Sequence, residues 1–258
     1  MDPVEMNAQF RDNGFCIFPE ALSKSELSRA RLALDRGAKA AQSKGIAHLK
    51  GLDPNAANIR VSNLPAIDPV FIDLLMRGDA LAAVEALLGP HYLISNFSAN
   101  IALPGSKSMR LHSDQSLVIP PPWTQVLAMN IIWCLDDVHA DNGATLYLPG
   151  SHHFQTPDEV PADALSKMRP FEAPAGSFIA MDGRLWHTSG SNITANQQRR
   201  MMFAYYSADF IRQEINWALA LPGEVQAAMD ERTRARFGLS AMGHTRIAVE
   251  LTAITPLS

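Results

Sequence analysis

A histidine and an aspartate stand two positions apart in the segment GSKSMRLHSDQSLVIP, which spans residues 105–120. Two histidines and one carboxylate can bind one side of a transition metal and leave the other side open for chemistry. Residues i and i+2 of a strand project from the same face, so His112 and Asp114 could reach one ion. The pattern therefore predicts two ligands of a metal site, although an edge strand with a polar face is the simpler interpretation.

The third ligand has to come from a distant segment. Of the eight histidines, His187 follows an apolar run and precedes a Gly-Ser-rich loop, in GSFIAMDGRLWHTSGSN. His139, His152 and His153 lie instead in segments with the composition of turns, where a structural role is expected. We therefore expect a later strand to return His187 to the side of His112.

Two arginines open a later apolar run, RRMMFAYYSA, at positions 199 and 200. A guanidinium in apolar surroundings needs an anionic partner, and it can bind a carboxylate through two hydrogen bonds. Neighbouring residues of a strand face opposite ways, so only one of the two arginines can point inward. A metal beside an arginine suits a ligand that chelates at one end and carries a carboxylate at the other, such as 2-oxoglutarate.

The elements that must position these residues change in character near residue 90. Before it, a strand is predicted over residues 14–19, followed by a helix that begins at a Ser23–Glu26 capping box and by further helices from Pro69 and Asp79. After it, short apolar runs alternate with turn residues, as in an all-β sandwich or jelly roll. The polar segment over residues 222–238 is again predicted to be helical.

We expect one domain over residues 1–258, mainly β with flanking helices. Its predicted parts are a helical N-terminal part (about 1–90), a jelly-roll core (about 92–210) and a helical C-terminal tail. No interdomain linker or internal repeat interrupts the sequence.

Composition excludes several classes of protein. The net charge is −4 and the pI is about 6.0, with no stripe of basic residues, so a nucleic-acid partner is not expected. No run of about 18 apolar residues predicts a membrane span. The two cysteines lie in apolar runs and indicate no disulfide framework, and no signal peptide is recognised. These features predict a cytoplasmic protein.

Four segments together resemble the phytanoyl-CoA dioxygenase family of Fe(II)/2-oxoglutarate-dependent oxygenases. They are FRDNGFCIFPEALSKSEL, HSDQ, NIIWCLDDVHADNGATLYLPGSHHF, and WHTSGSN with the following RR; they occur in the family's order over most of residues 10–207. The resemblance implies a double-stranded β-helix (a jelly roll, cupin-like) with outer helices. It also implies Fe(II) bound by His112, Asp114 and His187, with 2-oxoglutarate and O₂ as cosubstrates.

The resemblance extends to the residues that bind 2-oxoglutarate. Arg199 best matches the basic residue that binds the distal carboxylate, although the family's usual spacing points to position 198, which is Gln here, so Arg200 stays an alternative. Thr145, Ser189 and, more weakly, Asn130 match positions that hydrogen-bond the cosubstrate. Candidate substrate contacts are Asn63, Gln115 and Trp123.

The retained carboxylate at position 114 favours an oxygenase, because related halogenases carry a small residue there. The reaction implied is oxidation, in most cases hydroxylation, of an unactivated C–H bond of a small organic molecule, with a secondary metabolite as one candidate. Succinate and CO₂ are released. Desaturation, epoxidation and rearrangement stay open, as does the oligomeric state. The alternatives are a non-catalytic jelly roll that binds a small ligand and a cupin-type enzyme with another metal.

Overall fold

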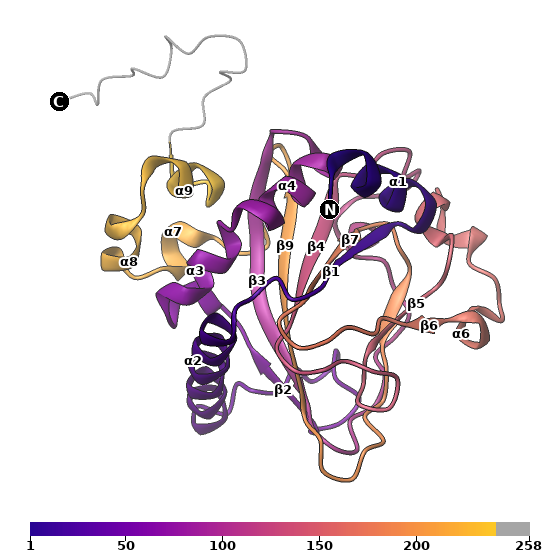
Figure 1. Ribbon diagram of the computed structural model, residues 1–258, viewed down its shortest axis with the longest axis horizontal. Helices are drawn as coiled ribbons and strands as arrows, with labels where there is room; N and C mark the ends of the chain where they lie inside the picture. Colours follow the sequence, from indigo (N-terminus) through magenta and orange to yellow (C-terminus); the bar gives the residue numbers. More distant parts are fainter. Residues whose placement is uncertain (241–258) are drawn as a thin grey trace.

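The structure, a computed structural model, describes residues 1–240, and two antiparallel sheets form its centre (Figure 1). The larger sheet has the strand order β1-β7-β4-β9-β3-β2, and the smaller sheet has the order β6-β5-β8. The strands are β1 (Phe15–Phe18), β2 (Asn58–Val61), β3 (Tyr92–Ala102), β4 (Ala128–Cys134), β5 (Thr145–Tyr147), β6 (Arg169–Pro170), β7 (Phe178–Asp182), β8 (His187–Ser189) and β9 (Arg199–Ala208).

Helices lie along one side of the larger sheet, and the smaller sheet lies on its other side (Figure 1). The helices of the N-terminal half are α1 (Pro3–Asn13), α2 (Lys24–Ser43), α3 (Pro69–Leu75) and α4 (Gly78–Leu88). The later ones are α5 (Asp114–Val118), α6 (Ala164–Lys167), α7 (Trp217–Ala220), α8 (Gly223–Ala228) and α9 (Glu231–Arg236), with 3₁₀ turns at Leu64–Ala66, Ser151–His153 and Pro157–Glu159.

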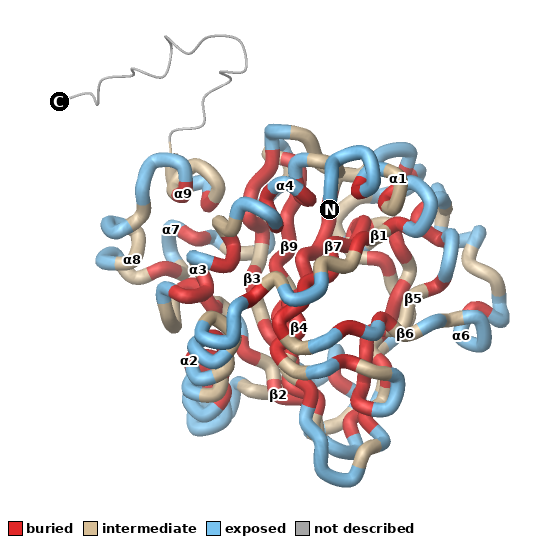
Figure 2. The backbone as a smooth tube through the Cα atoms, in the orientation of Figure 1, coloured by how far each residue is buried: buried red, intermediate tan, exposed pale blue. Residues whose placement is uncertain are grey.

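Side chains of the larger sheet alternate between two apolar clusters. Trp133 and Met202 belong to the cluster under the helices, whereas their neighbours Ile132 and Met201 belong to the cluster between the two sheets. The strands are accordingly the most deeply buried part of the chain (Figure 2). The central strands read as nearly continuous apolar runs because both of their faces are covered.

The predicted jelly roll with flanking helices is confirmed, but its strands begin earlier than expected. β1 and β2 precede residue 90 and form the two edges of the larger sheet. β1 falls within the predicted residues 14–19. β2 (NIRV) was missed, because only two of its four residues are strongly apolar. The capping box at Ser23 is present and starts α2 as predicted.

Two helical segments also differ from the expectation. α1 was not predicted; the Asp2 side chain accepts hydrogen bonds from the backbone N–H groups of Val4 and Glu5, and Gly14 ends the helix with a left-handed conformation. The tail forms two short helices instead of one. Asp230 interrupts it because its side chain caps α9. No helix within the described part of the chain has the length and apolar character needed to cross a bilayer.

Gly183 follows β7 and lies against the start of β4. Because it has no side chain, the two backbone segments can approach closely. Its N–H donates to the carbonyl oxygen of Ala128 at 2.9 Å, and a Cβ at position 183 would overlap that same oxygen. We expect Gly183→Ala to lower the free energy of unfolding by about 1–3 kcal/mol, as forced overpacking does. Denaturant unfolding followed by circular dichroism measures this change.

The matched control is Gly78→Ala at the start of α4, where an added Cβ meets no atom within 4 Å. This variant is expected to be as stable as the unmodified protein or up to about 1 kcal/mol more stable. Equal stability of the two alanine variants would contradict the close-approach argument.

Candidate metal centre

His112 pairs with His187 at the edge strand β8 of the smaller sheet. Each donates its N–H to the other's carbonyl oxygen, at 3.0 Å and 2.7 Å. Because the two residues form a single antiparallel bridge, their imidazole rings lie on the same face, with ring centroids 4.4 Å apart. This pairing brings together histidines that are far apart in the sequence, as predicted.

The aspartate of the predicted pair does not lie on a strand. Asp114 is the first residue of α5, and the side chain of Ser113 caps that helix by accepting from the N–H of Ser116. The expectation that His112 and Asp114 project from one face of a strand is therefore wrong. The chain turns into a helix after His112, and this turn still directs the carboxylate toward both imidazoles.

The three side chains offer a compact set of ligand atoms. The Nε2 atoms of His112 and of His187 are each 3.7 Å from Asp114 Oδ1, and one ligand atom from each residue lies within 4.8 Å of the others. Each Nδ1 faces a backbone carbonyl oxygen at 2.9 Å, that of Arg110 for His112 and that of Leu185 for His187. With the proton held on Nδ1, the Nε2 lone pairs are available to a metal.

Burial favours the neutral form of one ligand. His187 is 8% exposed, and its burial lowers the pKa of the imidazole, although the negative charge of Asp114 opposes that shift. A neutral imidazole is the form that binds a metal. The electrostatics of the site thus agree with its geometry.

The carboxylate is oriented by residues of the larger sheet. The side-chain amide of Asn130, on β4, donates to Asp114 Oδ2. The hydroxyl of Tyr205, on β9, donates to the backbone carbonyl of Asp114 at 3.4 Å. With Oδ2 engaged by Asn130, Oδ1 faces the two histidines. Asn130 therefore positions the carboxylate, and its own Oδ1 has no hydrogen-bond partner within the described structure.

A cavity of about 190 Å³ contains the three side chains. Its walls come from both sheets and from the segments around them. The residues that line it besides the triad are Leu52, Arg60, Asn96, Ser98, Met109, Leu117, Asn130, Thr145, Ser189, Phe203, Tyr205 and Glu214.

Two of the predicted cosubstrate residues face each other in this cavity. Thr145 of β5 pairs with Ser189 of β8 in the smaller sheet, and both line the wall beside His187. The hydroxyl oxygen of Ser189 accepts a hydrogen bond from the N–H of Met109 at 3.0 Å. Ser189 therefore also fixes the position of Met109, in the segment that leads to His112.

The structure separates the two candidate arginines. Arg199 shares a face of β9 with Phe203 and Tyr205, which line the cavity, and it is 1% exposed. Among the described residues its guanidinium has hydrogen bonds only to oxygens of Asn100, at 3.2 Å and 3.4 Å, and its Nε has none. Burial lowers the pKa of Arg199 to about 10, so it is still charged at neutral pH.

Arg200 points to the opposite face, away from the cavity. Its guanidinium forms ion pairs with Asp35 of α2 at 2.8 Å and with Asp136 at 3.1 Å. These two carboxylates satisfy its charge, so that it is a structural link between β9 and the outer helices. Of these two arginines, only Arg199 has no carboxylate partner within residues 1–240.

Three predicted substrate contacts lie outside the cavity. Gln115 is fully buried, and its amide binds the backbone of Gln125, Leu127 and Ala128, so it fastens α5 to the start of β4. Trp123 is 2% exposed and donates to the carbonyl of Ile119.

Asn63 is the third. Its amide donates to the carbonyl of Ala220 at 2.8 Å, which ties it to α7. The hydrogen bonds of the three side chains join segments of the fold, and none of the three lines the cavity, so the structure does not place them where a substrate would meet the metal.

Several cavity residues were missed at the sequence level. Asn96, Ser98 and Asn100 alternate with apolar residues along β3, and the first two line the cavity. This polar face could have indicated a strand that borders a cavity. Tyr205 follows from the same alternation once Arg199 is taken to point inward. No local pattern in the sequence indicates that Glu214 lines the cavity. The pKa of its carboxyl group is raised, mainly by burial and also by the charge of Asp114, while the hydrogen bond from Asn96 opposes this shift.

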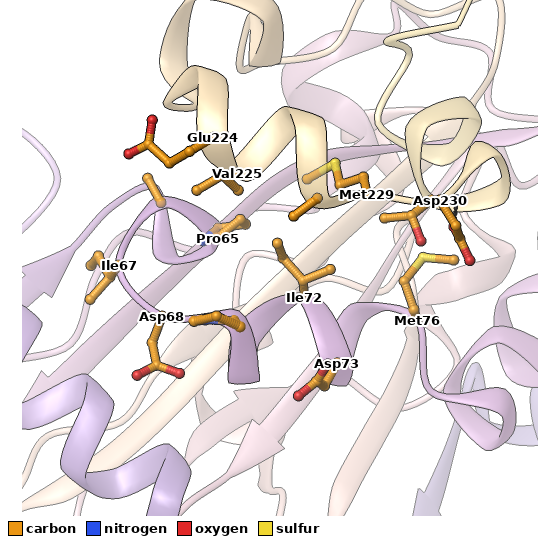
Figure 3. A pocket seen from close by; sticks show the side chains of 14 residues that line it. Pro65, Ile67, Asp68, Ile72, Asp73, Met76, Glu224, Val225, Met229 and Asp230 are labelled. Atoms are coloured by element: carbon orange, nitrogen blue, oxygen red, sulfur yellow. Dashed lines mark hydrogen bonds between the residues drawn. The ribbon is translucent and has the colours of Figure 1, made fainter.

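A larger cavity, of about 560 Å³, lies between α3 and the C-terminal helices α8 and α9 (Figure 3). Ile72, Val225 and Met229 lie along it, whereas the carboxylates of Asp68 and Glu224 point away. Among residues 1–240, only His112, Asp114 and His187 form a cluster that could bind a metal, and none of them lines this larger cavity. Size alone therefore does not identify the reactive site.

Comparison with known proteins identifies the family of the chain. Residues 10–201 match the phytanoyl-CoA dioxygenase (PhyH) family. A curated relative, the dioxygenase af480 of Aspergillus fumigatus, is 44% identical over 93% of this chain and 78% of its own length.

Solved structures show the same fold at low sequence identity. The non-heme alpha-ketoglutarate-dependent epimerase SnoN, from nogalamycin biosynthesis, superposes with a TM-score of 0.66 at 21% identity, over 86% of this chain and 89% of its own. HygX of Streptomyces hygroscopicus, determined with nickel, 2-oxoglutarate and hygromycin B, gives a TM-score of 0.63 at 19% identity, over 81% and 88%.

The fold, the triad and the family match define an iron- and 2-oxoglutarate-dependent dioxygenase, the enzyme class expected from the sequence. The chain belongs to the phytanoyl-CoA dioxygenase family. The alternative of a non-catalytic ligand-binding jelly roll is therefore set aside.

Proposed function

We propose that this dioxygenase hydroxylates an unactivated C–H bond of a small organic molecule, with release of succinate and CO₂. In this proposal His112, Asp114 and His187 hold Fe(II), and the described residues act as one catalytic domain. The single observation that carries the proposal is the convergence of these three side chains in one cavity, with Nε2 of both imidazoles free.

The residues present fit the metal. Two neutral imidazoles and one carboxylate supply three ligands on one side of the ion, which leaves the other side for 2-oxoglutarate and O₂. Bound iron would supply the oxidising chemistry, and the chain would orient the reactants and exclude water. Asn130 and the two backbone carbonyls that face the Nδ1 atoms would keep the ligand atoms aimed at the ion.

The 2-oxoglutarate end of the site is supported by charge. Arg199 is buried with no carboxylate bound to it among the described residues, and its burial is costly without an anion. Arg60 of β2 faces the same interior but is already paired with Asp53 at 2.7 Å. We therefore assign the distal carboxylate of 2-oxoglutarate to Arg199, and a second contact to the Thr145–Ser189 pair.

Anaerobic titration of the purified apoprotein, followed by visible absorption, tests this function. Fe(II) and 2-oxoglutarate together are expected to produce a metal-to-ligand charge-transfer band that neither produces alone, and Asp114→Ala is expected to lose it. If the two together produce no band, the chain shares the scaffold of the family without this cofactor set, and a cupin-type enzyme with another metal becomes the leading alternative.

Asn130→Ala is expected to weaken Fe(II) binding by about 10–100-fold, as loss of a residue that orients a metal ligand does. The reason is that Asp114 loses the donor that holds its Oδ2 and directs its Oδ1 toward the histidines. Anaerobic equilibrium dialysis measures the affinity.

Asn58→Ala is the control, because Asn58 also lies on the inner face of the larger sheet but contacts Asn100 instead of a triad residue. Equal losses in the two variants would contradict a positioning role for Asn130.

A further inference from the structure

The segment after β9 places a carboxylate at one end of the metal cavity. Glu214 lines that cavity, and its Oε2 accepts a hydrogen bond from the side-chain amide of Asn96 at 2.8 Å. Its backbone N–H donates to the hydroxyl of Ser95 at 2.9 Å, and the N–H of Ile215 donates to the carbonyl of Ser95 at 3.1 Å. Glu214 is therefore held at both its backbone and its side chain.

The reason for this placement is an irregularity in β3. The pairing of β3 with β9 shifts between Ile94 and Asn96, so Ser95 has no partner residue on β9. A residue left out of the ladder offers its polar groups to another segment. Here the segment of Glu214 takes them, which fixes the carboxylate beside the cavity instead of leaving it in a loose loop.

Glu214 lies at the metal end of the cavity, away from the proposed 2-oxoglutarate anchor. Asn96, its partner, pairs with Tyr205 across the sheet, and Tyr205 pairs in turn with Asn130, which binds Asp114. Arg199 lies six residues before Tyr205 on the same strand, about 20 Å along it at the usual rise of a strand. The cosubstrate carboxylate and Glu214 would thus be on opposite sides of the metal.

Apolar side chains line the cavity as well as polar ones. Leu117 of α5 is 66% exposed and Leu52 is 43% exposed, yet both line the cavity together with Phe203. Exposed leucines at a cavity edge provide a contact surface for an apolar molecule. Such a molecule would meet these apolar side chains and the carboxylate of Glu214.

We propose that Glu214 accepts a hydrogen bond from the substrate, and that the substrate is a compact apolar molecule with a hydroxyl or ammonium group. The inference rests on the proposed function, because it names the substrate class of the same site. It excludes substrates whose polar group at this end is a carboxylate or another anion, since two like charges would face each other. It also disfavours ethers and ketones, which cannot donate.

Four probes with one apolar cage test the proposal: 1-adamantanol, 1-adamantylamine, 1-methoxyadamantane and 1-adamantanecarboxylate. Their binding to the anaerobic enzyme loaded with Fe(II) and 2-oxoglutarate is measured by calorimetry. We expect the alcohol and the amine to bind about tenfold or more tightly than the ether, because a hydrogen bond to a charged acceptor is worth about that factor. The carboxylate is expected to bind more weakly than the ether.

Glu214→Gln is expected to reduce the advantage of the amine over the ether to about threefold or less, and to improve binding of the carboxylate probe relative to the ether. The measured quantity is the ratio of the affinities of two probes for the same variant. A general loss of affinity leaves this ratio unchanged. Glu224→Gln on α8 is the matched control, because that carboxylate points away from its neighbouring cavity, and it should keep the ratios of the unmodified enzyme.

Two results would overturn the inference: equal ratios in the Glu214→Gln variant and the unmodified enzyme, or no binding of any probe to an enzyme that shows the charge-transfer band. The band itself separates this outcome from failure of the proposed function. If the band is absent, the cofactor assignment fails, whereas a normal band with unselective binding contradicts the role of Glu214 alone.

Discussion

Replacement of His187 by Ala is expected to abolish turnover and to lower the Fe(II) affinity by more than about 100-fold, beyond the 10–100-fold typical of residues that only orient a ligand. The substitution removes one of three ligands and leaves Asp114 and His112 without the geometry that selects the metal. Because the backbone pairing of positions 112 and 187 uses only main-chain groups, the fold is expected to persist. Iron content after anaerobic loading, and succinate release from 2-oxoglutarate, measure the two effects.

His153→Ala is the matched control, since His153 is an exposed histidine in a 3₁₀ turn outside the cavity. It is expected to bind iron like the unmodified protein. An iron affinity of His187→Ala within a few-fold of the control, with an unchanged circular dichroism spectrum, would falsify the assignment of this residue as a ligand.

The second large effect is expected at the cosubstrate anchor. Arg199→Ala should raise the KM for 2-oxoglutarate by about 10–100-fold, as expected for loss of hydrogen bonds between two charged groups, while Fe(II) still binds. Arg199→Lys should recover only part of the loss, because an ammonium lacks the planar fork that binds a carboxylate through two bonds. Initial rates of succinate release at varied 2-oxoglutarate concentration give the KM.

Arg200→Ala separates a role in binding from a role in stability. Its ion pairs with Asp35 and Asp136 link β9 to the outside of the sheet, so its loss should reduce the thermal stability and leave the KM for 2-oxoglutarate within about twofold. A raised KM in Arg200→Ala with a normal KM in Arg199→Ala would show that the anchor is on the other face of the strand.

Much of the candidate site could be predicted because its chemistry depends on residue types that the sequence shows directly. His112, Asp114 and His187 are recognisable as potential ligands wherever the chain places them, and an arginine at the head of an apolar strand signals a buried charge. The strict alternation of a strand also shows that positions 199 and 200 face opposite ways. Which of the two faces inward depends on the neighbouring strands, and only the pairing of β9 with β3 and β4 decided it.

The predicted substrate contacts lie outside the cavity for a related reason. Gln115, Trp123 and Asn63 have side chains that could serve either a ligand or the fold, and their local sequence does not distinguish these roles. Their hydrogen bonds reach backbone groups 10, 4 and 157 residues away, respectively, and these bonds fasten the side chains to the fold. Glu214 shows the opposite outcome: it lines the cavity but was not predicted. No residue near it in the sequence indicates that Ser95 and Asn96 will hold it there.

The sequence by itself determined the class of chemistry, the β-rich core and the alternation of side chains along its strands, because these follow from residue types and from short-range periodicity. Tertiary structure alone decided that Asp114 begins a helix, that β1 and β2 form the edges of the larger sheet, and that Glu214 lines the metal cavity. The physical reason is that these features depend on hydrogen bonds between segments far apart in the chain. A backbone group that stays unpaired within its own strand or helix needs a partner from another segment, and the local sequence does not show which segment supplies it.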